Sequence, residues 1–282
     1  MKDIVVGSIT NYDFDKIKCW VNSLDRSGFS GHKILICYNI DYDTCEEITK
    51  RGYTIFGFKN NDEKKTLEYP KKDFSVVVER FLHMWYFLAD KRDIRYIIST
   101  DVKDVIFQSN PSDWLDKNYK DGILASQESI MYCDEDWGKN NMKKAFGEIV
   151  YEEYKNEIIH NAGVIAGSPN YFIDLCLNIY LICNGMPGYI DGGGGPDQAA
   201  LNIVLNSEAY KRCTFSVPSE RAWAAQLGTV SNPRYFGKTT APCPKFDLEK
   251  GIVTTDSGEP FVIVHQYDRI PDLKKKIEEK YE

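Results

Sequence analysis

Residues 4–58 read IVVGSITNYDFDKIKCWVNSLDRSGFSGHKILICYNIDYDTCEEITKRGYTIFGF, and this stretch decides the fold class. A β-branched run at Ile4–Ile9 predicts a buried strand, and a second apolar run at Lys33–Tyr38 predicts another. Between them, Asp13–Ser27 has helical spacing. Its apolar face comprises Phe14, Ile17, Trp20, Val21 and Leu24.

A short helix at Thr44–Arg51 and a third strand at Gly52–Phe58 complete a β-α-β-α-β series, which is typical of a sheet with helices on both faces. The alternation continues downstream, and no repeat or linker divides the chain. The further predicted elements are a charged loop at Asn60–Asp73, helices at Phe74–Asp90, Met142–Tyr154, Tyr171–Cys183 and Pro196–Asn206, strands at Arg95–Thr100, Ile123–Ser126 and Pro260–Val264, a short apolar segment at Ile159–Ala166, and a charged, solvated helix at Asp272–Glu282.

The bulk composition narrows the class of protein. The chain has 282 residues, of which 43% are hydrophobic, so it can bury one large core. Its net charge of -7 disfavours nucleic acid as a partner. The eight cysteines form no CxxC pair, which favours free thiols in a reducing compartment. The sequence has no apolar run long enough to cross a membrane, so we expect a cytoplasmic protein with no transmembrane segment. No oligomeric state is predicted.

The stretch RYIISTDVKDVIFQ at 95–108 carries the main chemical signal. A hydrophobic strand is followed at once by two carboxylates, Asp101 and Asp104. In open α/β sheets, ligands bind beyond the carboxyl ends of the strands, and hard oxygen donors there suit Mg²⁺ or Mn²⁺. The alternative is structural, with Asp101 capping a turn and Asp104 exposed in a loop.

A second apolar run, FVIVHQYD at 261–268, leads into His265. A neutral imidazole is a suitable additional ligand for Mn²⁺, although a histidine packed in a core or loop would give the same pattern. Of the other three histidines, His83 and His32 are interpreted as structural, and His160 stays open.

Two glycine-containing segments could lie against a ligand. In DGGGGPDQAALN at 191–202, four glycines permit a close approach or a moving loop, and Asp197 and Gln198 fall in the first turn of the following helix. A flexible turn before an acidic helix start is the alternative. In HNAGVIAGS at 160–168, small residues flank an apolar strand. Neither segment has the GxGxxG or GxxxxGK[ST] spacing of the dinucleotide and P-loop folds.

Taken in order, these segments resemble the GT-A glycosyltransferases, in particular the glycogenin-like and related families. The likeness covers roughly Val5 to His265. It implies one α/β domain, an α/β/α sandwich with a central mixed, mostly parallel sheet. Residues 1–108 would form the nucleotide-binding half, 109–270 the acceptor and sugar-binding half, and 271–282 a C-terminal helix.

The resemblance also implies roles for the acidic motif. In these families it holds a divalent metal, Mn²⁺ or Mg²⁺, against the donor diphosphate. Here the usual Asp-x-Asp is replaced by Asp101-Val102-Lys103-Asp104, so Asp104 is expected to bind metal and Asp101 to serve the ribose, the metal or both. His265 matches the late metal-binding histidine of the family.

The remaining expectations concern the substrates, a nucleotide sugar, most simply a UDP-sugar, and a glycan or other hydroxyl acceptor. Arg80 would lie near the sugar or diphosphate. Further residues implied by the resemblance are Ser8, Thr10, Asn11 and Tyr12 around the base, and Asn161, Asp197 and Gln198 around the sugar and acceptor.

The reaction is less constrained than the substrates. An inverting enzyme needs a carboxylate base, for which Asp197 is the first candidate, followed by Asp191 and Glu128. The glycogenin-like resemblance leans toward retention instead. Two other functions stay open: a sugar-nucleotide nucleotidyltransferase, which would need a basic glycine-rich loop after the first strand, and a non-catalytic sugar- or nucleotide-binding module on the same fold.

Overall fold

The computed structural model describes residues 1–91, 93–190 and 194–282 and contains a central sheet of seven strands. All its strands run parallel except β10, which is antiparallel to both neighbours. In spatial order the strands are β11 (Thr214–Val217), β9 (Ile123–Met131), β10 (Ile158–Gly167), β7 (Ile94–Thr100), β1 (Lys2–Thr10), β2 (His32–Tyr38) and β4 (Thr54–Phe56). The expected mixed, mostly parallel sheet is therefore confirmed.

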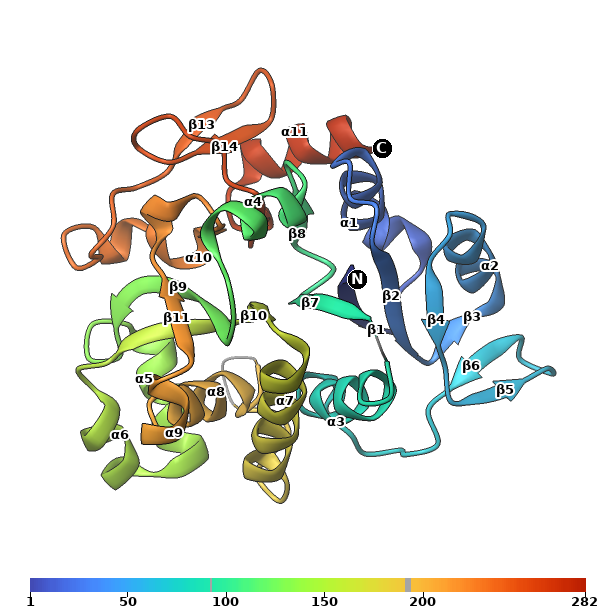
Figure 1. Cartoon of the computed structure of the whole chain (residues 1–282), viewed down its shortest axis with the longest axis horizontal. Helices are drawn as coiled ribbons and strands as arrows, with labels where there is room; N and C mark the ends of the chain where they lie inside the picture. The colour runs from blue at the N-terminus through green and yellow to red at the C-terminus, as the bar shows by residue number, and fades with distance from the viewer. Residues whose placement is uncertain (92, 191–193) are drawn as a thin grey trace.

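Helices cover both faces of this sheet (Figure 1). On one face lie α1 (Phe14–Arg26), α2 (Tyr42–Lys50) and α4 (Pro111–Asn118), and on the other α3 (Val76–Leu88), α7 (Pro169–Cys183) and α8 (Asp197–Leu205). Side chains alternate between the two faces along each strand. In β1, Val5 packs into the core under α1, whereas Ile4 and Val6 pack into the core under α3 and α7. The sheet with helices on both faces is the arrangement that the β-α-β-α-β series predicts.

Helix α1 is defined by a cap at its N-terminus and by one apolar face. The Asp13 side chain caps the helix by accepting a hydrogen bond from the Lys16 N–H at 3.1 Å. Ile17, Trp20 and Leu24 are fully buried against the sheet. Spacing of three and four residues places these side chains on one face of a helix, so the apolar stripe and the cap together define the element.

Two predicted segments differ from the structure. The expected loop at Asn60–Asp73 contains β5 (Lys59–Asn61) and β6 (Thr66–Glu68), and β6 also pairs with β3 (Ile40–Asp41). These short strands are polar, so no alternation of apolar residues revealed them. The helix expected at Met142–Tyr154 is two helices, α5 (Asp136–Phe146) and α6 (Glu148–Tyr154). They are separated by Gly147, whose φ of 89° ends the first helix.

A second sheet joins three segments that are distant in sequence. Its strand order is β12 (Ala224–Gln226), β15 (Ile263–His265) and β8 (Val105–Phe107). Strand β15 is shorter than predicted and ends on His265 itself. Because β8 and β15 run antiparallel, His265 lies opposite Val105, directly after Asp104. This pairing brings the C-terminal histidine to the end of β7.

The C-terminal helix is anchored rather than only solvated. Leu273 and Ile277 in α11 (Pro271–Tyr281) are fully buried, and the Asn22 side chain of α1 donates to the Tyr281 carbonyl oxygen at 2.6 Å. The remaining elements are α9 (Glu208–Lys211), η1 (Ser219–Arg221), α10 (Leu227–Val230), η2 (Pro233–Tyr235), β13 (Lys245–Asp247), β14 (Ile252–Thr254) and η3 (Tyr267–Arg269). In the described parts of the chain, no helix has the length and apolar character needed to cross a membrane.

Candidate metal centre and active site

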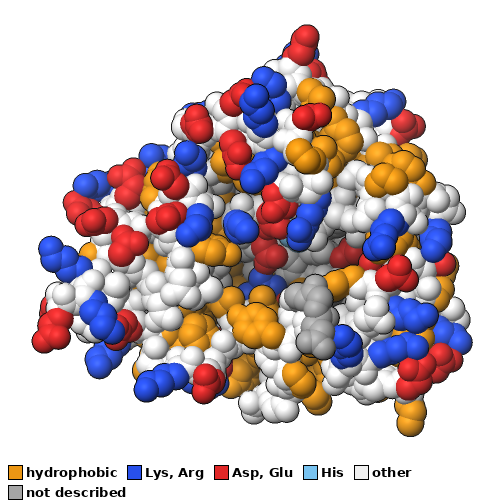
Figure 2. Space-filling model, turned by 180° about the vertical axis from the view of Figure 1, so that it is seen from behind, with side chains coloured by type: hydrophobic (Ala, Val, Ile, Leu, Met, Phe, Trp, Pro, Cys, Tyr) orange, Lys and Arg blue, Asp and Glu red, His pale blue; other side chains and the backbone are white. Residues whose placement is uncertain are grey.

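A cleft of about 710 Å³ opens where β7 ends. Figure 2 shows a hollow in the molecular surface with acidic side chains inside it. Eight residues singled out from the sequence line the cleft: Arg80, Asp101, Asp104, Glu128, Asn161, Asp197, Gln198 and His265. Segments that are far apart in the chain therefore share one site.

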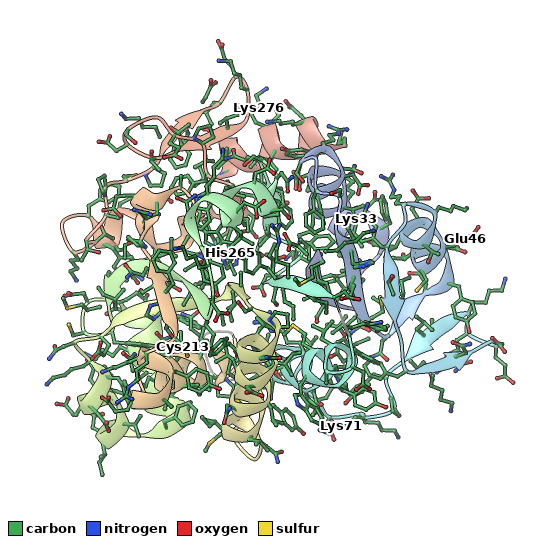
Figure 3. The ribbon with its side chains drawn as sticks, viewed as in Figure 1. Lys33, Glu46, Lys71, Cys213, His265 and Lys276 are labelled. Atoms are coloured by element: carbon green, nitrogen blue, oxygen red, sulfur yellow. The ribbon has the colours of Figure 1, made fainter. Side chains whose placement is uncertain are left out.

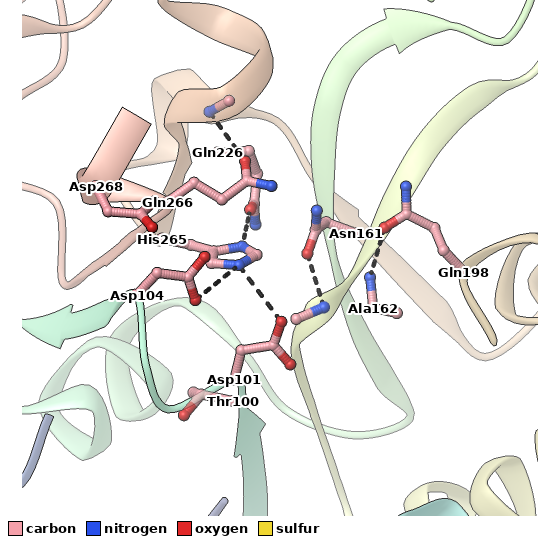
Figure 4. Close-up of polar contacts among 12 residues, drawn as sticks. Thr100, Asp101, Asp104, Asn161, Ala162, Gln198, Gln226, His265, Gln266 and Asp268 are labelled. Atoms are coloured by element: carbon pink, nitrogen blue, oxygen red, sulfur yellow. Dashed lines mark hydrogen bonds and ion pairs between the residues drawn. The ribbon is translucent and has the colours of Figure 1, made fainter. Parts of the chain in front are cut away.

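Asp101, Asp104 and His265 form a compact group within the cleft, the candidate metal group (Figure 4). His265 lies in the interior of the molecule (Figure 3). One ligand atom from each of the three lies within 4.8 Å of the others. His265 Nε2 is 3.6 Å from Asp101 Oδ2 and 3.7 Å from Asp104 Oδ1. Two carboxylates and an imidazole are a donor set that suits Mn²⁺ or Mg²⁺, so the residues fit the expected metal.

The electrostatics of the group also favour a cation. Burial raises the pKa of Asp104. Burial also opposes ionisation of Asp101, but the Arg80 guanidinium and His265 outweigh it and hold the pKa of Asp101 below its ordinary value. Burial disfavours the imidazolium form of His265, yet Asp104 and Asp101 outweigh this effect and raise its pKa. The two carboxylates thus stabilise positive charge at His265.

Arg80 links two of the candidate acids. Its Nη1 donates to Asp101 Oδ1, and its Nη2 donates to Asp197 Oδ2 at 3.0 Å and to the Ala162 carbonyl oxygen at 3.2 Å. Burial raises the pKa of Asp197, although the Arg80 charge opposes this shift. Asp197 therefore lines the cleft, with one of its oxygens engaged in a buried ion pair.

Glu128 accepts hydrogen bonds from three other residues that line the cleft. Its Oε1 accepts from Asn161 Nδ2 at 2.7 Å and from Gln198 Nε2 at 3.0 Å. Its Oε2 accepts from Thr229 Oγ1 at 2.7 Å. Burial raises the pKa of Glu128, while these donors stabilise its charged form. The carboxylate is thus held by protein donors on both oxygens.

The amides of Asn161 and Gln198 are also bonded on their oxygen side. Asn161 Oδ1 accepts from the Gly163 N–H at 2.7 Å, and Gln198 Oε1 accepts from the Ala162 N–H at 3.3 Å. Both side chains therefore brace the backbone of β10 beside the metal group. Contact with a sugar, which the resemblance implies for them, stays a prediction.

Replacing Glu128 by glutamine is expected to leave the fold intact, because the amide oxygen still accepts from Asn161 and Gln198 and the Thr229 hydroxyl can rotate to accept from the new N–H. Alanine instead leaves three buried donors unpaired and should lower the free energy of unfolding by at least about 1–3 kcal/mol. Chemical denaturation of both variants measures this difference. Equal losses for E128Q and E128A would contradict the network.

Gly163 shows how closely the backbone approaches the metal group. A Cβ at this position would lie 2.4 Å from His265 Cε1 and 2.9 Å from Asp101 Oδ2. We expect Gly163→Ala to displace these side chains and to cost about 1–3 kcal/mol of stability through overpacking. Gly188→Ala is the control, since its methyl meets Ser75 Cβ at 3.1 Å. Thermal unfolding of both variants should show the larger decrease for Gly163→Ala; the reverse order would be incompatible with the close contact.

The residues expected around the nucleotide base lie beside the cleft rather than in its lining. Ser8 follows Gly7, which pairs with Thr100, the last residue of β7, so Ser8 and Asp101 each follow a residue of this pair. Thr10 ends β1, and Asn11 has a φ of 53°. Tyr12 is half-buried; burial raises its pKa, with further contributions from Asp101 and Asp104. Asp191, the second candidate base, lies outside the described residues.

The three histidines outside the metal group either make structural hydrogen bonds or lie at the surface. His83 Nδ1 is hydrogen-bonded to the Tyr38 hydroxyl at 2.7 Å, and His160 bonds Ser216 Oγ at 2.7 Å through Nε2. Burial lowers the pKa of His160 to about 4. The open question about His160 therefore resolves in favour of a packing role, and His32 is exposed on the surface.

Several cleft residues were not found from the sequence. They come from turns and helices: Glu135, Trp137, Arg234, Tyr235, Gln266 and Arg269. Gln226, which contacts His265 but does not line the cleft, was also missed. Turns carry no periodic signal, so only their position in space identifies them.

Comparison with known proteins identifies the fold. No protein-family model and no curated protein matches the sequence. Among solved structures, the apo WbbM bifunctional glycosyltransferase aligns over 99% of this chain and 51% of its own, with a TM-score of 0.55 and 10% identity. The chain has a glycosyltransferase fold. The apo-form glycosyltransferase GlyE of Streptococcus pneumoniae TIGR4 aligns over 94% of this chain and 54% of its own, with a TM-score of 0.51 and 13% identity. This glycosyltransferase fold spans about half the length of either structure.

Proposed function

We propose that the chain is a metal-dependent glycosyltransferase that moves a sugar from a nucleoside-diphosphate donor, most simply a UDP-sugar, to a hydroxyl of a glycan or other acceptor. One observation carries the proposal. Asp101, Asp104 and His265 converge at the end of β7, in a cleft of a fold shared with glycosyltransferases.

In this proposal Asp101, Asp104 and His265 would hold Mn²⁺ or Mg²⁺. A divalent cation held there would stabilise the negative charge that develops on the diphosphate leaving group. Ser8, Thr10, Asn11 and Tyr12 would bind the nucleoside from the neighbouring strand, with Tyr12 against the base. Asp101 would in addition meet the ribose, because Ser8 and Asp101 directly follow the paired residues Gly7 and Thr100.

The acceptor would enter from the wall formed by residues 227–235. Arg80 would keep Asp101 and Asp197 charged and oriented. Asn161 and Gln198 would position the backbone at 162–163 beside the donor sugar. If the enzyme inverts, Asp197 or Asp191 would accept the proton of the attacking hydroxyl. Residues 1–108 and 109–270 would then act as the nucleotide half and the acceptor half, followed by the helix at 271–282.

A reducing compartment is the proposed location, because all eight cysteines are free thiols and six of them are buried or half-buried: Cys19, Cys37, Cys45, Cys176, Cys183 and Cys213. Cytoplasmic activity on a soluble nucleotide sugar would be consistent with it.

A screen of nucleotide sugars by thermal shift, with and without Mn²⁺, tests the function, since a ligand that binds the folded state raises its apparent stability. We expect a UDP-sugar to stabilise the protein only with metal and to be hydrolysed slowly. Metal-independent sugar binding without turnover would instead indicate a binding module. Release of pyrophosphate from a nucleoside triphosphate would indicate a nucleotidyltransferase.

A further inference from the structure

Gln226 contacts His265 of the metal group at the ring nitrogen that does not face the two carboxylates. It is fully buried at the end of β12, where it lies opposite His265 in the parallel β12–β15 pair. Its Oε1 is 2.7 Å from His265 Nδ1 (Figure 4). The other ring nitrogen, Nε2, faces Asp101 and Asp104. The imidazole therefore bridges Gln226 and the two carboxylates.

The contact determines which nitrogen carries the proton. An amide oxygen can only accept a hydrogen bond, so His265 Nδ1 must donate to Gln226 Oε1. A neutral imidazole has a single N–H, and Nε2 is then left with a lone pair directed at the carboxylates. This is the form that binds a metal. Histidines that ligate metals commonly donate their other N–H to an acceptor that fixes the ring.

Hydrogen bonds of Gln266 hold the backbone around this contact in place. Gln266, next to His265, accepts from the Gly228 N–H at 2.9 Å through its Oε1. The Gln266 N–H donates to the Asp104 carbonyl oxygen at 2.8 Å. The two glutamines thus connect β12, β15 and the segment after β7, so Gln226 and His265 are held in one arrangement relative to Asp104.

The geometry points to Gln226 as a positioning residue for the metal centre, which holds His265 in the Nδ1–H tautomer and directs Nε2 at a divalent cation between Asp101 and Asp104. The inference rests on the proposed function, because it requires that these three residues bind a cation. Its distinguishing consequence is that metal affinity depends on a hydrogen-bond acceptor at position 226, and not only on a side chain that fills the space.

Binding of Mn²⁺ alone to the purified chain, followed by the EPR signal of free Mn²⁺, tests this consequence without any turnover. Gln226→Met keeps the approximate shape but removes the acceptor, and we expect its affinity for Mn²⁺ to fall by about 10–100-fold. Gln226→Glu keeps an acceptor and should retain the affinity. Gln108→Met is the matched control, because Gln108 binds the backbone of Val253 and Phe261 instead of the metal group; its affinity should be unchanged.

Nitrogen-15 NMR of the imidazoles in the Mg²⁺-loaded protein gives a second readout, since the chain has four histidines. The wild type and Gln226→Glu should show His265 protonated at Nδ1 only. If the wild type binds no Mn²⁺, the proposed metal site itself fails. If it binds Mn²⁺ and Gln226→Met binds equally tightly, only the role of Gln226 is overturned. Should Gln226→Met not fold, an Nε2–H tautomer in the loaded wild type would overturn it instead.

Discussion

Replacing Asp104 by asparagine is expected to reduce metal-dependent donor hydrolysis by about 10²–10⁴-fold, because the metal contributes several kcal/mol of charge stabilisation and each 1.36 kcal/mol is about tenfold in rate. The amide is a neutral and weaker ligand than the carboxylate, and Asp104 lies 3.7 Å from His265 Nε2 in the only such acid–imidazole group found among the described residues. Steady-state hydrolysis of the donor at saturating Mn²⁺ measures the effect.

Asp268→Asn is the matched control for this experiment. Asp268 adds negative charge near Asp104 but does not belong to the group of three ligands. The two variants remove the same charge, so a selective loss in Asp104→Asn identifies a ligand rather than a general field. Equal rates for Asp104→Asn and the wild type would refute the metal assignment.

Replacing Arg80 by methionine is expected to lower the free energy of unfolding by about 3–5 kcal/mol, because removing one partner of a buried ion pair leaves an uncompensated charge. Arg80 is 7% exposed and binds both Asp101 and Asp197. Chemical denaturation at neutral pH measures the loss. Arg51→Met is the control; Arg51 pairs with Glu47 at the surface, where an exposed pair contributes about 0–1 kcal/mol.

The pH dependence of the Arg80→Met variant provides a second check. Without the guanidinium, burial should raise the carboxyl pKa values of the folded variant above those of its unfolded chain. The folded variant then binds protons more tightly, so its stability falls as pH rises through the raised pKa values. The deficit relative to the wild type should therefore be smaller at mildly acidic pH than at pH 8. A deficit that does not change with pH would indicate lost packing rather than unpaired charge.

Local sequence patterns were sufficient to predict much of the fold. The β-branched run of β1 and the apolar stripe of α1 were recognisable because both depend on neighbours within about two turns of chain. Gly147 divided a predicted helix in two, since a residue with positive φ interrupts the backbone where the apolar pattern continues. The hairpin at Lys59–Glu68 was missed because its strands are polar and pair only with each other and with β3.

The candidate site was predicted in part for the same reason. Asp101 and Asp104 follow a recognisable strand, and the positions of His265, Asp197 and Gln198 in the sequence resemble a known order of motifs. Nothing in the sequence singled out Gln226, and the pairing of Arg80 with two acids could not be deduced from its place on α3. These contacts connect segments that lie far apart in the sequence.

By itself the sequence determined the class of fold, the strand that carries the acids, and the helices that cover the sheet, because periodicity and capping act over short distances along the chain. Only the tertiary structure decided which side chains meet: β15 pairs with β8 and β12, which brings His265 to Asp104 and Gln226 to His265. The physical reason is that strand register across long separations is set by the packing of the whole sheet, and a shift of one residue would turn each side chain to the opposite face.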